Sequence, residues 1–354
     1  MAERGSPRSA DVTAGWLGAT REELHARVMT GVAGGSGGAL DVIVMNPRSG
    51  NDTVERFGLL ATAERLGARV LLTTADRSAA ALARLAVESG ARRLGVAGGD
   101  GTVSAVAAVA ADAGCPLIVI PAGTRNHFAR DLGLDTTDPE RALRALLDPD
   151  PVRVDLGAVQ SHTFVNNVSF GPYADALLEP GYREAKARSF ASVTPAYLDG
   201  QRSIDARIET PSETIEAPQV VLVSNNPYHL ATLRFLGRRF SLSAGSLGAI
   251  VVTRQPVPPP PALVAAVRND LRRTGAADVP GSGVVVWSAT EVTLSGGGSM
   301  LPAGLDGEPV ELRLPITCRV RPGALTVHLP TDRPGVPREP GTSSGADEPG
   351  RAGG

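Results

Sequence analysis

The stretch VAGGDGT at residues 96–102, followed by IPAGTRNHFAR at residues 120–130, decides the fold of this chain. Each glycine-rich segment follows an apolar run rich in β-branched residues and precedes a pattern with helical spacing. This order predicts a strand, a tight turn and a helix, twice in succession. Glycine lets a bound group approach the backbone, and free amide groups at a helix start attract phosphate. The two turns therefore predict a nucleotide site, with Asp100 placed in it for chemistry.

The residues around these turns repeat the same alternation. Apolar runs occur at residues 42–45, 70–73, 94–97 and 117–120, and helical patterns at 53–66, 78–89 and 103–113. Continuous apolar strands that alternate with helices predict a parallel sheet covered on both faces. The predicted fold is therefore a Rossmann-like, three-layer α/β nucleotide domain, and its ligand is expected at the carboxyl ends of the strands.

After about residue 153 the pattern changes. Strand-like runs follow one another without regular helices at residues 220–223, 249–252, 284–287, 292–294 and 325–329, and one helix is expected at 261–273. This pattern predicts an antiparallel β-sandwich. We expect a flexible extension at 1–40, the α/β domain at 41–153, a β-sandwich lipid-substrate domain at 154–330 and a disordered tail at 331–354.

Composition excludes several classes of function. The 354 residues are 42% hydrophobic, which suffices for two cores, and the net charge of −2 gives no general attraction to nucleic acid. We see no signal peptide, and no apolar run reaches the length of about 18 residues that a membrane-spanning helix requires. Cys115 and Cys318 lack metal-site spacing, so they are expected as free thiols in a reducing cytoplasm.

Five motifs occur in one order along the chain. They are NPxSG at residues 46–50, GGDGT at 98–102, PxGTxNxFAR at 121–130, VDLG at 154–157 with FVNN at 164–167, and LDGE at 305–308. One glycine-rich turn would be weak evidence, whereas five in order are specific. From about residue 41 to about residue 330, the chain resembles the bacterial diacylglycerol kinase-like lipid kinases, the family that includes sphingosine kinases and eukaryotic diacylglycerol kinases.

The resemblance implies an ATP- and Mg²⁺-dependent transfer of phosphate to a lipid hydroxyl, with diacylglycerol as the default acceptor and phosphatidic acid as the product. It also implies a set of nucleotide-binding residues. By position in the motifs these are Asn46, Pro47, Ser49, Gly50, Thr73, Gly98, Gly99, Asp100, Gly101, Thr102, Gly123, Thr124 and Asn126. Several also have a structural interpretation, such as an Asn-Pro turn at the first motif or a helix cap at Thr73.

Three carboxylates carry the chemistry by resemblance. Asp100 would hold Mg·ATP or accept the proton of the lipid hydroxyl, and Asp155 would face that hydroxyl or the metal from the domain junction. Glu308 would be the proton acceptor, although an Asp-Gly hairpin turn explains its neighbours equally well. A lipid hydroxyl must be positioned and deprotonated, and a metal must bridge the phosphates. The sequence leaves open whether Asp100 or Glu308 takes the proton, and it does not identify the metal ligands.

The chain departs from the family's pattern in three places. Ser104 and Ala105 stand where Asn and Glu are frequent, and His127 stands where Asp is common, so we expect His127 to fill its place structurally. The loop at residues 242–247 has no acid, so a second, structural Mg²⁺ is expected to be absent. The segment 228–240 mixes apolar residues with arginines, which indicates either a membrane-facing loop or a hairpin with a solvated Arg face.

Two other functions remain open from the sequence. NAD kinases share the GGDGT turn, but their second loop usually reads Gly-x-Asn-x-Gly, unlike residues 121–130. A catalytically weak lipid- or nucleotide-binding regulator would account for Ala105, His127 and Ala244. For the main interpretation, the expected partner is a lipid at the bilayer surface, met by peripheral membrane association from the cytoplasm and without nucleic acid. A homodimer is left open.

Overall fold

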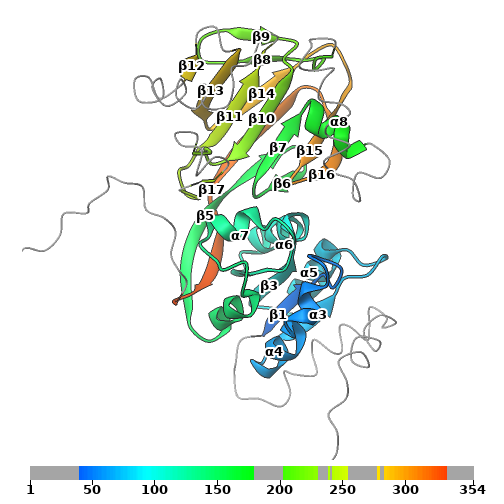
Figure 1. Ribbon diagram of the computed structural model, residues 1–354, viewed down its shortest axis with the longest axis vertical. Coiled ribbons are helices and arrows are strands. Elements are labelled where there is room, and N and C mark those ends of the chain that lie inside the picture. Colours follow the sequence, from blue (N-terminus) through cyan, green and yellow to red (C-terminus); the bar gives the residue numbers. More distant parts are fainter. Residues whose placement is uncertain are drawn as a thin grey trace, which may run out of the picture.

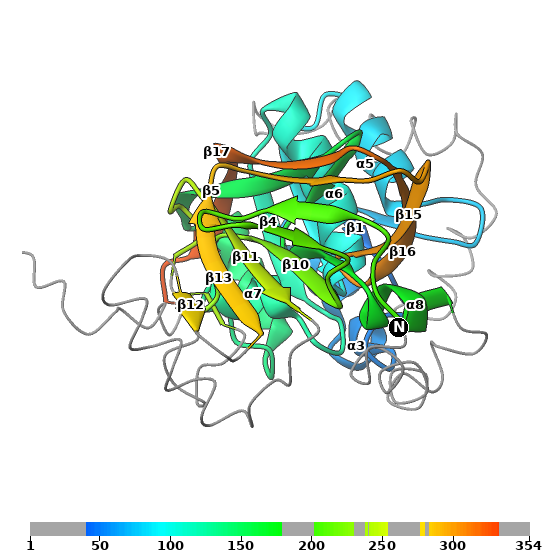
Figure 2. The same cartoon turned by 90° about the horizontal axis from the view of Figure 1, so that it is seen from above.

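The computed structural model describes residues 40–178, 202–229, 238–239, 241–253, 277–279 and 283–332. Two units lie along the long axis, one built of helices around a sheet and one built almost entirely of strands (Figure 1). Figure 2 looks down this axis through the strands onto the helices beneath them. The predicted extension at 1–40, the predicted helix at 261–273 and the predicted tail at 331–354 lie outside the described residues, apart from residues 40, 331 and 332.

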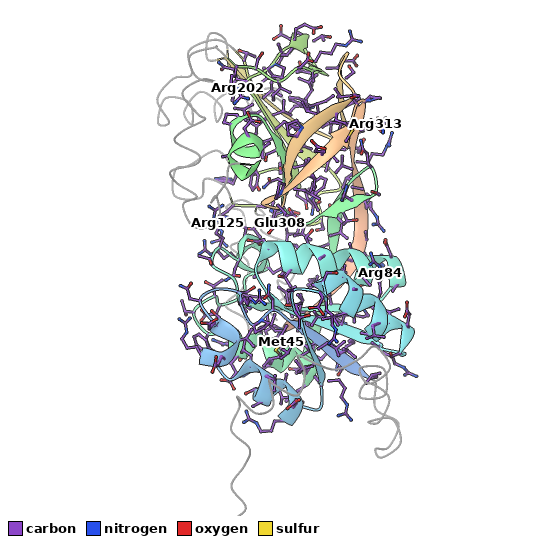
Figure 3. The ribbon with its side chains drawn as sticks, turned by 90° about the vertical axis from the view of Figure 1, so that its right-hand side faces the viewer. Met45, Arg84, Arg125, Arg202, Glu308 and Arg313 are labelled. Carbon is purple, nitrogen blue, oxygen red and sulfur yellow. The ribbon has the colours of Figure 1, made fainter. Side chains whose placement is uncertain are left out.

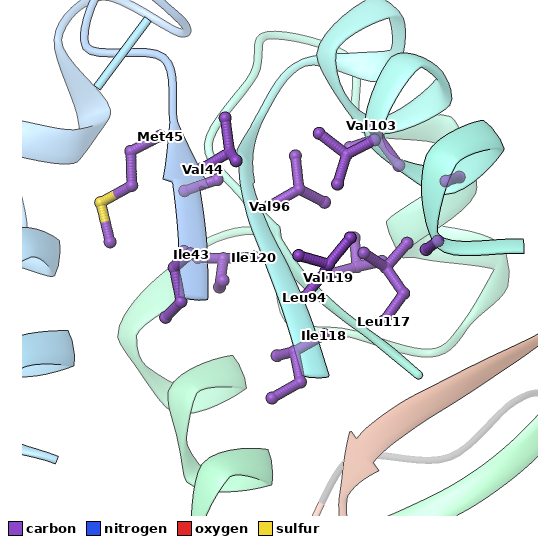
Figure 4. Packing of buried hydrophobic residues seen from close by; sticks show 14 of the residues in the cluster. Ile43, Val44, Met45, Leu94, Val96, Val103, Leu117, Ile118, Val119 and Ile120 are labelled. Atoms are coloured by element: carbon purple, nitrogen blue, oxygen red, sulfur yellow. The ribbon is translucent and has the colours of Figure 1, made fainter. Parts of the chain in front are cut away.

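The first unit is built on a parallel sheet of four strands. In spatial order these are β2 (Arg69–Leu72), β1 (Asp41–Met45), β3 (Arg93–Gly98) and β4 (Leu117–Pro121). Their side chains are buried on both faces, which is why the strands are continuously apolar (Figure 4). The predicted doubly covered α/β sheet is confirmed, and its glycine-rich turns all leave the carboxyl ends of strands.

The helices of this unit are α3 (Thr53–Arg56), α4 (Leu59–Arg65), α5 (Ala79–Glu88), α6 (Asp100–Ala113), α7 (His127–Asp131) and the 3₁₀ helix η1 (Pro139–Leu146). The single helix predicted at 53–66 is two helices, because Gly58 adopts a left-handed conformation with φ 59°. Ser78 caps α5 by accepting a hydrogen bond from the Ala81 amide. Helix α6 begins at Asp100, three residues before the predicted start, so the GGDGT turn is itself the helix start.

The second unit is the predicted antiparallel β-sandwich. One sheet has the order β12 (Ala277–Val279), β13 (Val284–Ala289), β11 (Leu247–Val252), β10 (Val220–Asn225), β7 (Asn167–Phe170), β15 (Met300–Leu305) and β16 (Glu308–Arg313). The other contains β6 (His162–Phe164), β8 (Arg207–Glu209), β9 (Thr214–Glu216), β14 (Glu291–Ser295) and parts of β5 and β17, and helix α8 (Pro172–Leu178) follows β7. The second hydrophobic core, which includes Phe164, Phe170 and Trp287, packs between the sheets.

Two long strands join the units. Strand β5 (Pro149–Val159) pairs antiparallel with β17 (Ile316–Pro330), and a register shift between Arg321 and Leu325 bends the pair. Cys318 lies in the second core, whereas Val327 pairs with β4 and lies in the first. The last part of β17 therefore completes the first sheet, although it falls in the range 154–330 that was predicted to form the second domain.

Both cysteines are free, and burial raises the pKa of the Cys318 thiol to about 12. This thiol therefore stays protonated at physiological pH and packs as a small apolar side chain. Within the described residues, no helix is long and apolar enough to cross a membrane.

A substitution at Gly157 tests how tightly β5 and β6 pack. It lies opposite Phe164, and a Cβ at Gly157 would come within 2.1 Å of the Phe164 ring. We expect Gly157→Ala to lower the free energy of unfolding by at least about 1–3 kcal/mol, since the ring must move within a packed core. Gly297→Ala is the matched control, because no atom lies within 4 Å of a Cβ there. Urea denaturation measures both, and equal stability of the two variants would contradict this packing.

Candidate active site

A cleft of about 610 Å³ lies where the two units meet. Glycine-rich loops of the α/β unit form one wall, and the other comes from the sandwich. Figure 3 shows Glu308 at the junction between the units and Arg125 at the same level. The residues that line the cleft from the α/β loops are Asn46, Arg48, Ser49, Gly50, Gly99, Asp100, Gly101, Thr102, Gly123, Thr124, Arg125 and His127.

The two phosphate-type turns touch through their backbones. A Cβ at Gly123 would lie 2.3 Å from the Cα of Gly99, which is closer than real Cβ contacts come. The two loops therefore need glycine at position 123 in order to lie side by side. Gly99, Gly101 and Gly123 line the cleft without side chains, a feature that lets the backbone of glycine-rich loops come close to phosphate.

The first motif is fixed onto these turns. The Asn46 side chain donates to the Thr102 hydroxyl at 3.3 Å and accepts from the Arg48 amide at 3.1 Å. Gly50 has φ 59°, and a Cβ there would come within 2.5 Å of the Ala122 carbonyl oxygen. The structure thus brings the three predicted loops together, with Asn46, Ser49 and Gly50 on the cleft wall. Pro47 and Thr73 are not among the residues that line the cleft.

Asn126 builds the second loop. Its side chain accepts from the Gly123 amide and donates to the Gly123 carbonyl, both at 2.8 Å, while its backbone takes the left-handed φ of 54°. Asn tolerates this conformation better than most residues. The amide of Asn126 is buried in these contacts, and the exposed residues that the loop presents to the cleft are Thr124 and Arg125.

Asp100 is half-buried and lies at the centre of the cleft. One carboxylate oxygen accepts from the Phe128 amide and from the Asn166 side chain, and the other accepts from the His127 amide, all at 3.2 Å. Asp100 therefore holds the start of α7 and a sandwich residue at once. These contacts use three of about four acceptor directions of the carboxylate. One direction on the Oδ2 atom remains for a ligand.

Glu308 reaches the same turn from the sandwich. It is exposed, it lines the cleft, and its Cγ and Oε1 atoms would lie 3.2 Å from a Cβ at Gly101. Two residues earlier, the buried Asp306 accepts hydrogen bonds from the backbone amides of Val165, Asn166 and Asn167 at 2.8–2.9 Å. Burial raises the pKa of Asp306, and hydrogen bonding from the Ser104 side chain and from these amides opposes the shift. Asp306 thereby anchors the hairpin that carries Glu308.

Asp155 lies elsewhere. It is 2% exposed and is not among the residues that line the cleft. Its carboxylate accepts from the amides of Gly323 and Gly245 and from the Asn226 side chain at 2.7–2.8 Å. It thus ties β5 to the bend of β17 and to the loop at 242–247. The structure does not bring Asp155 to Asp100 and Glu308, so the catalytic role expected for it finds no support in the geometry.

His127 lines the cleft beside Asp100. Desolvation by the surrounding protein lowers the pKa of the imidazole, and the nearby Asp100 carboxylate opposes this shift. The residue contributes its backbone amide to Asp100, in keeping with the structural role expected from the sequence. Ser104, the other departure on this side, is buried on α6 and donates to the Thr163 carbonyl at 3.3 Å.

The sequence favours either a membrane-facing loop or a hairpin with a solvated Arg face at residues 228–240, and both are wrong for Arg239. Its side chain is fully buried and forms an ion pair with Asp131, with the Nε atom 2.7 Å from Oδ2. Residues 230–237 and 240 of that segment lie outside the described residues. No local signal in the sequence marks an arginine for burial. Asn166, by contrast, belongs to the FVNN motif, although its contact with Asp100 was not anticipated.

Comparison with known proteins identifies relatives of this chain. The model of the diacylglycerol kinase catalytic domain matches residues 42–159. Over 288 residues the chain is 31% identical to a Pseudomonas fluorescens protein named "Probable lipid kinase YegS-like", a match that covers 75% of this chain and 87% of that protein. A diacylglycerol kinase of Mycobacterium tuberculosis is 36% identical over 119 residues, which are 32% of this chain and 38% of that protein.

The fold has solved counterparts. A crystal structure of a diacylglycerol kinase from Bacillus anthracis matches with a TM-score of 0.55 and 18% identity, covering 81% of this chain and 96% of that one. At this identity the likeness concerns the fold. It agrees with the α/β unit and the β-sandwich described above.

The contact between the two phosphate-type turns gives a test of the loop geometry. We expect Gly123→Ala to destabilise the protein by about 1–3 kcal/mol, because its Cβ would press on the Gly99 backbone. Gly99→Ala is the matched variant, since its Cβ would meet Gly123 at an ordinary 3.6 Å. Chemical denaturation of both variants measures the difference. If Gly99→Ala were the more destabilising of the two, the described contact would be incorrect.

Proposed function

The chain belongs to the diacylglycerol kinase-like lipid kinase family, and on this premise we propose that it transfers the γ-phosphate of ATP to the hydroxyl of a membrane lipid. Diacylglycerol is the first candidate acceptor, and phosphatidic acid would be the product. One observation carries the proposal: Glu308 of the sandwich lies against Gly101 of the phosphate-type turn, next to Asp100. Carboxylates from both units thus meet at the place where a phosphate would be transferred.

The α/β wall suits a nucleotide. Glycines at 99 and 101 leave room for phosphate oxygens to approach the backbone, and Arg48 and Arg125 line the same cleft. Asn46, Ser49, Gly50, Thr102 and Thr124 are the further residues proposed to contact ATP. Asn126 and Gly98 support the loops from behind, since the Asn126 side chain bonds to Gly123 and a Cβ at Gly98 would press on Thr102.

The residues also fit Mg²⁺. Among the described residues, no three His, Cys, Asp or Glu side chains gather closely enough to hold a metal by themselves. Mg²⁺ is usually held by one or two carboxylates together with substrate phosphates and water. Asp100, with one acceptor direction open, would supply such a carboxylate. Bound Mg²⁺ would neutralise the charge that develops on the phosphates.

The opposite wall offers apolar contacts for a lipid. The sandwich contributes Val220, Leu222 and Pro172 to the cleft, beside the polar Asn166, Asn167 and Ser169. A second groove of about 580 Å³ runs along α5 and α6, and it also reaches Gly101 and Glu308. Glu308 therefore lies where two hollows meet, as a reaction between a nucleotide and a second substrate requires. Such an acceptor places the reaction at a bilayer surface, and we propose peripheral membrane association at the cytoplasmic face.

We assign the proton acceptor to Glu308. The Asp100 carboxylate already accepts three hydrogen bonds that hold α7 and Asn166 in place. Glu308 is exposed and lies beside the turn. Glu308 comes from the sandwich, lines both hollows and lies against Gly101, so it is placed to take the proton of the acceptor hydroxyl as the oxygen attacks phosphorus, with the bond to ADP breaking in the same transfer.

Purified protein should transfer ³²P from γ-labelled ATP to lipid in vesicles that contain diacylglycerol, and EDTA should abolish the transfer. A total lipid extract offered in parallel, with mass spectrometry of the labelled product, identifies the preferred acceptor. NAD is the control acceptor for the NAD kinase alternative. Phosphorylation of NAD without any labelled lipid would overturn the proposal, and absence of both products would favour a binding protein without catalysis.

Glu308→Gln should lower kcat by about 10²–10⁴-fold, the usual contribution of a general base, while the affinity for ATP changes little. Gln keeps the shape of the side chain and removes its basicity. Glu311→Gln is the matched control, because Glu311 is exposed on the same strand β16 and is not among the residues that line the cleft. Steady-state kinetics and calorimetric ATP titration measure the two effects. Normal turnover of Glu308→Gln would move the base to Asp100 or water.

A further inference from the structure

Arg239 joins the two units at one buried point. Its guanidinium pairs with Asp131 of α7, with Nε 2.7 Å from Oδ2. The same guanidinium donates from Nη1 to the carbonyls of Val165 at 2.6 Å and Asn225 at 2.8 Å. From Nη2 it donates to the Asn166 side-chain oxygen at 2.7 Å. One side chain thus holds the last residue of α7 and the turn between β6 and β7.

The contact with Asn166 has a directional consequence. Because the Oδ1 atom of Asn166 accepts from Arg239, its Nδ2 atom must point the other way. There it donates to the Asp100 carboxylate at 3.2 Å. A flipped amide would turn its oxygen toward the carboxylate and lose both hydrogen bonds. Arg239 therefore determines that Asn166 presents a donor to Asp100.

The same turn also anchors the hairpin that bears the second proposed catalytic carboxylate, Glu308. Asp306 accepts from the backbone amides of residues 165–167, and Glu308 follows it on the hairpin. Residues 165–167 are therefore held by Arg239 on one side and by the Glu308 hairpin on the other. The relative placement of Asp100 and Glu308 depends on this turn.

We propose that Arg239 is a positioning residue for phosphoryl transfer, which acts through Asn166 to hold Asp100 in register with Glu308. The inference rests on the proposed function. Stability alone is a weak explanation for the arginine, since buried ion pairs are often no more stabilising than apolar side chains of similar volume. What an apolar side chain could not supply is the donor that orients Asn166.

A double-mutant cycle on kcat tests the inference. Arg239→Lys keeps a positive charge beside Asp131 but cannot reach all four acceptors with a fork of N–H groups. We expect Arg239→Lys and Asn166→Ala each to lower kcat about tenfold, with a smaller change in the KM for ATP. Because the two residues are in contact, we expect their effects on kcat to be non-additive. The double variant should be no slower than the slower single variant. Additive losses would show that Arg239 does not act through Asn166.

Loss of packing must be separated from loss of positioning. Leu294→Ala removes a fully buried side chain of the sandwich core and should lower Tm without changing kcat. Asn166→Asp serves if Arg239→Lys does not fold, because it keeps an acceptor for Arg239 and removes the donor to Asp100. The new carboxylate would face Asp100, so kcat should fall, and normal turnover would overturn the inference.

A crystal structure of the Arg239→Lys protein, or of Asn166→Asp, provides a readout that needs no activity. We expect the Asp100 carboxylate to leave residue 166 and to shift relative to Gly101. An unchanged Asp100 would refute the positioning role even if the wild-type protein phosphorylates lipid. Conversely, a wild-type protein that phosphorylates no lipid refutes the proposed function. In that case the position of Asp100 in the variant crystal structure still tests whether Arg239 holds it in place.

Discussion

The buried carboxylate of Asp306 is the interaction on which the site depends. It accepts three backbone amides from residues 165–167, in a place that is only 8% exposed. Desolvation opposes a charge there and raises the pKa of Asp306, while the Ser104 side chain and the converging amides act against that shift. The Asp306 carboxylate is therefore buried where backbone amides of residues 165–167 act as hydrogen-bond donors to it. This contact fixes the Glu308 hairpin against the Asn166 turn, and the turn is tied to the α/β unit through Asp100 and, by way of Arg239, through Asp131.

Much of the fold can be predicted because its signals are local. The apolar strands β1 to β4 and the turns after them follow from periodicity and glycine, and their order predicts a parallel sheet. The features that could not be predicted depend on contacts between residues far apart in the sequence or on the backbone conformation of a single residue. Gly58 divides a helical pattern by taking a positive φ. Strand β17 crosses from the second core into the first, and only its pairing with β4 and β5 shows this.

The candidate site divides in the same way. Asp100 and Glu308 lie more than 200 positions apart, and only the family resemblance carried by the five ordered motifs predicted one site for both. The function of Asn126 as a brace of its own loop depends on hydrogen-bond geometry, which composition does not encode. Arg239 was misjudged because an arginine beside apolar residues is usually solvated. Its burial requires Asp131 and the acceptors at Val165, Asn225 and Asn166, which come from distant parts of the chain.

Four carboxylates stand in the recognisable motifs, and their surroundings separate structural from chemical roles. Asp155 and Asp306 are buried, and each accepts three hydrogen bonds from the protein, so both hold loops together. Asp100 also accepts three, but it opens onto the cleft and keeps one direction for a ligand. Glu308 is the exposed member, and it lines both hollows, as does the buried Asp306. A carboxylate that binds metal or takes a proton must be accessible to the substrate. On this ground we propose that the chemistry belongs to Asp100 and Glu308 and that the other two hold the junction in which those two meet.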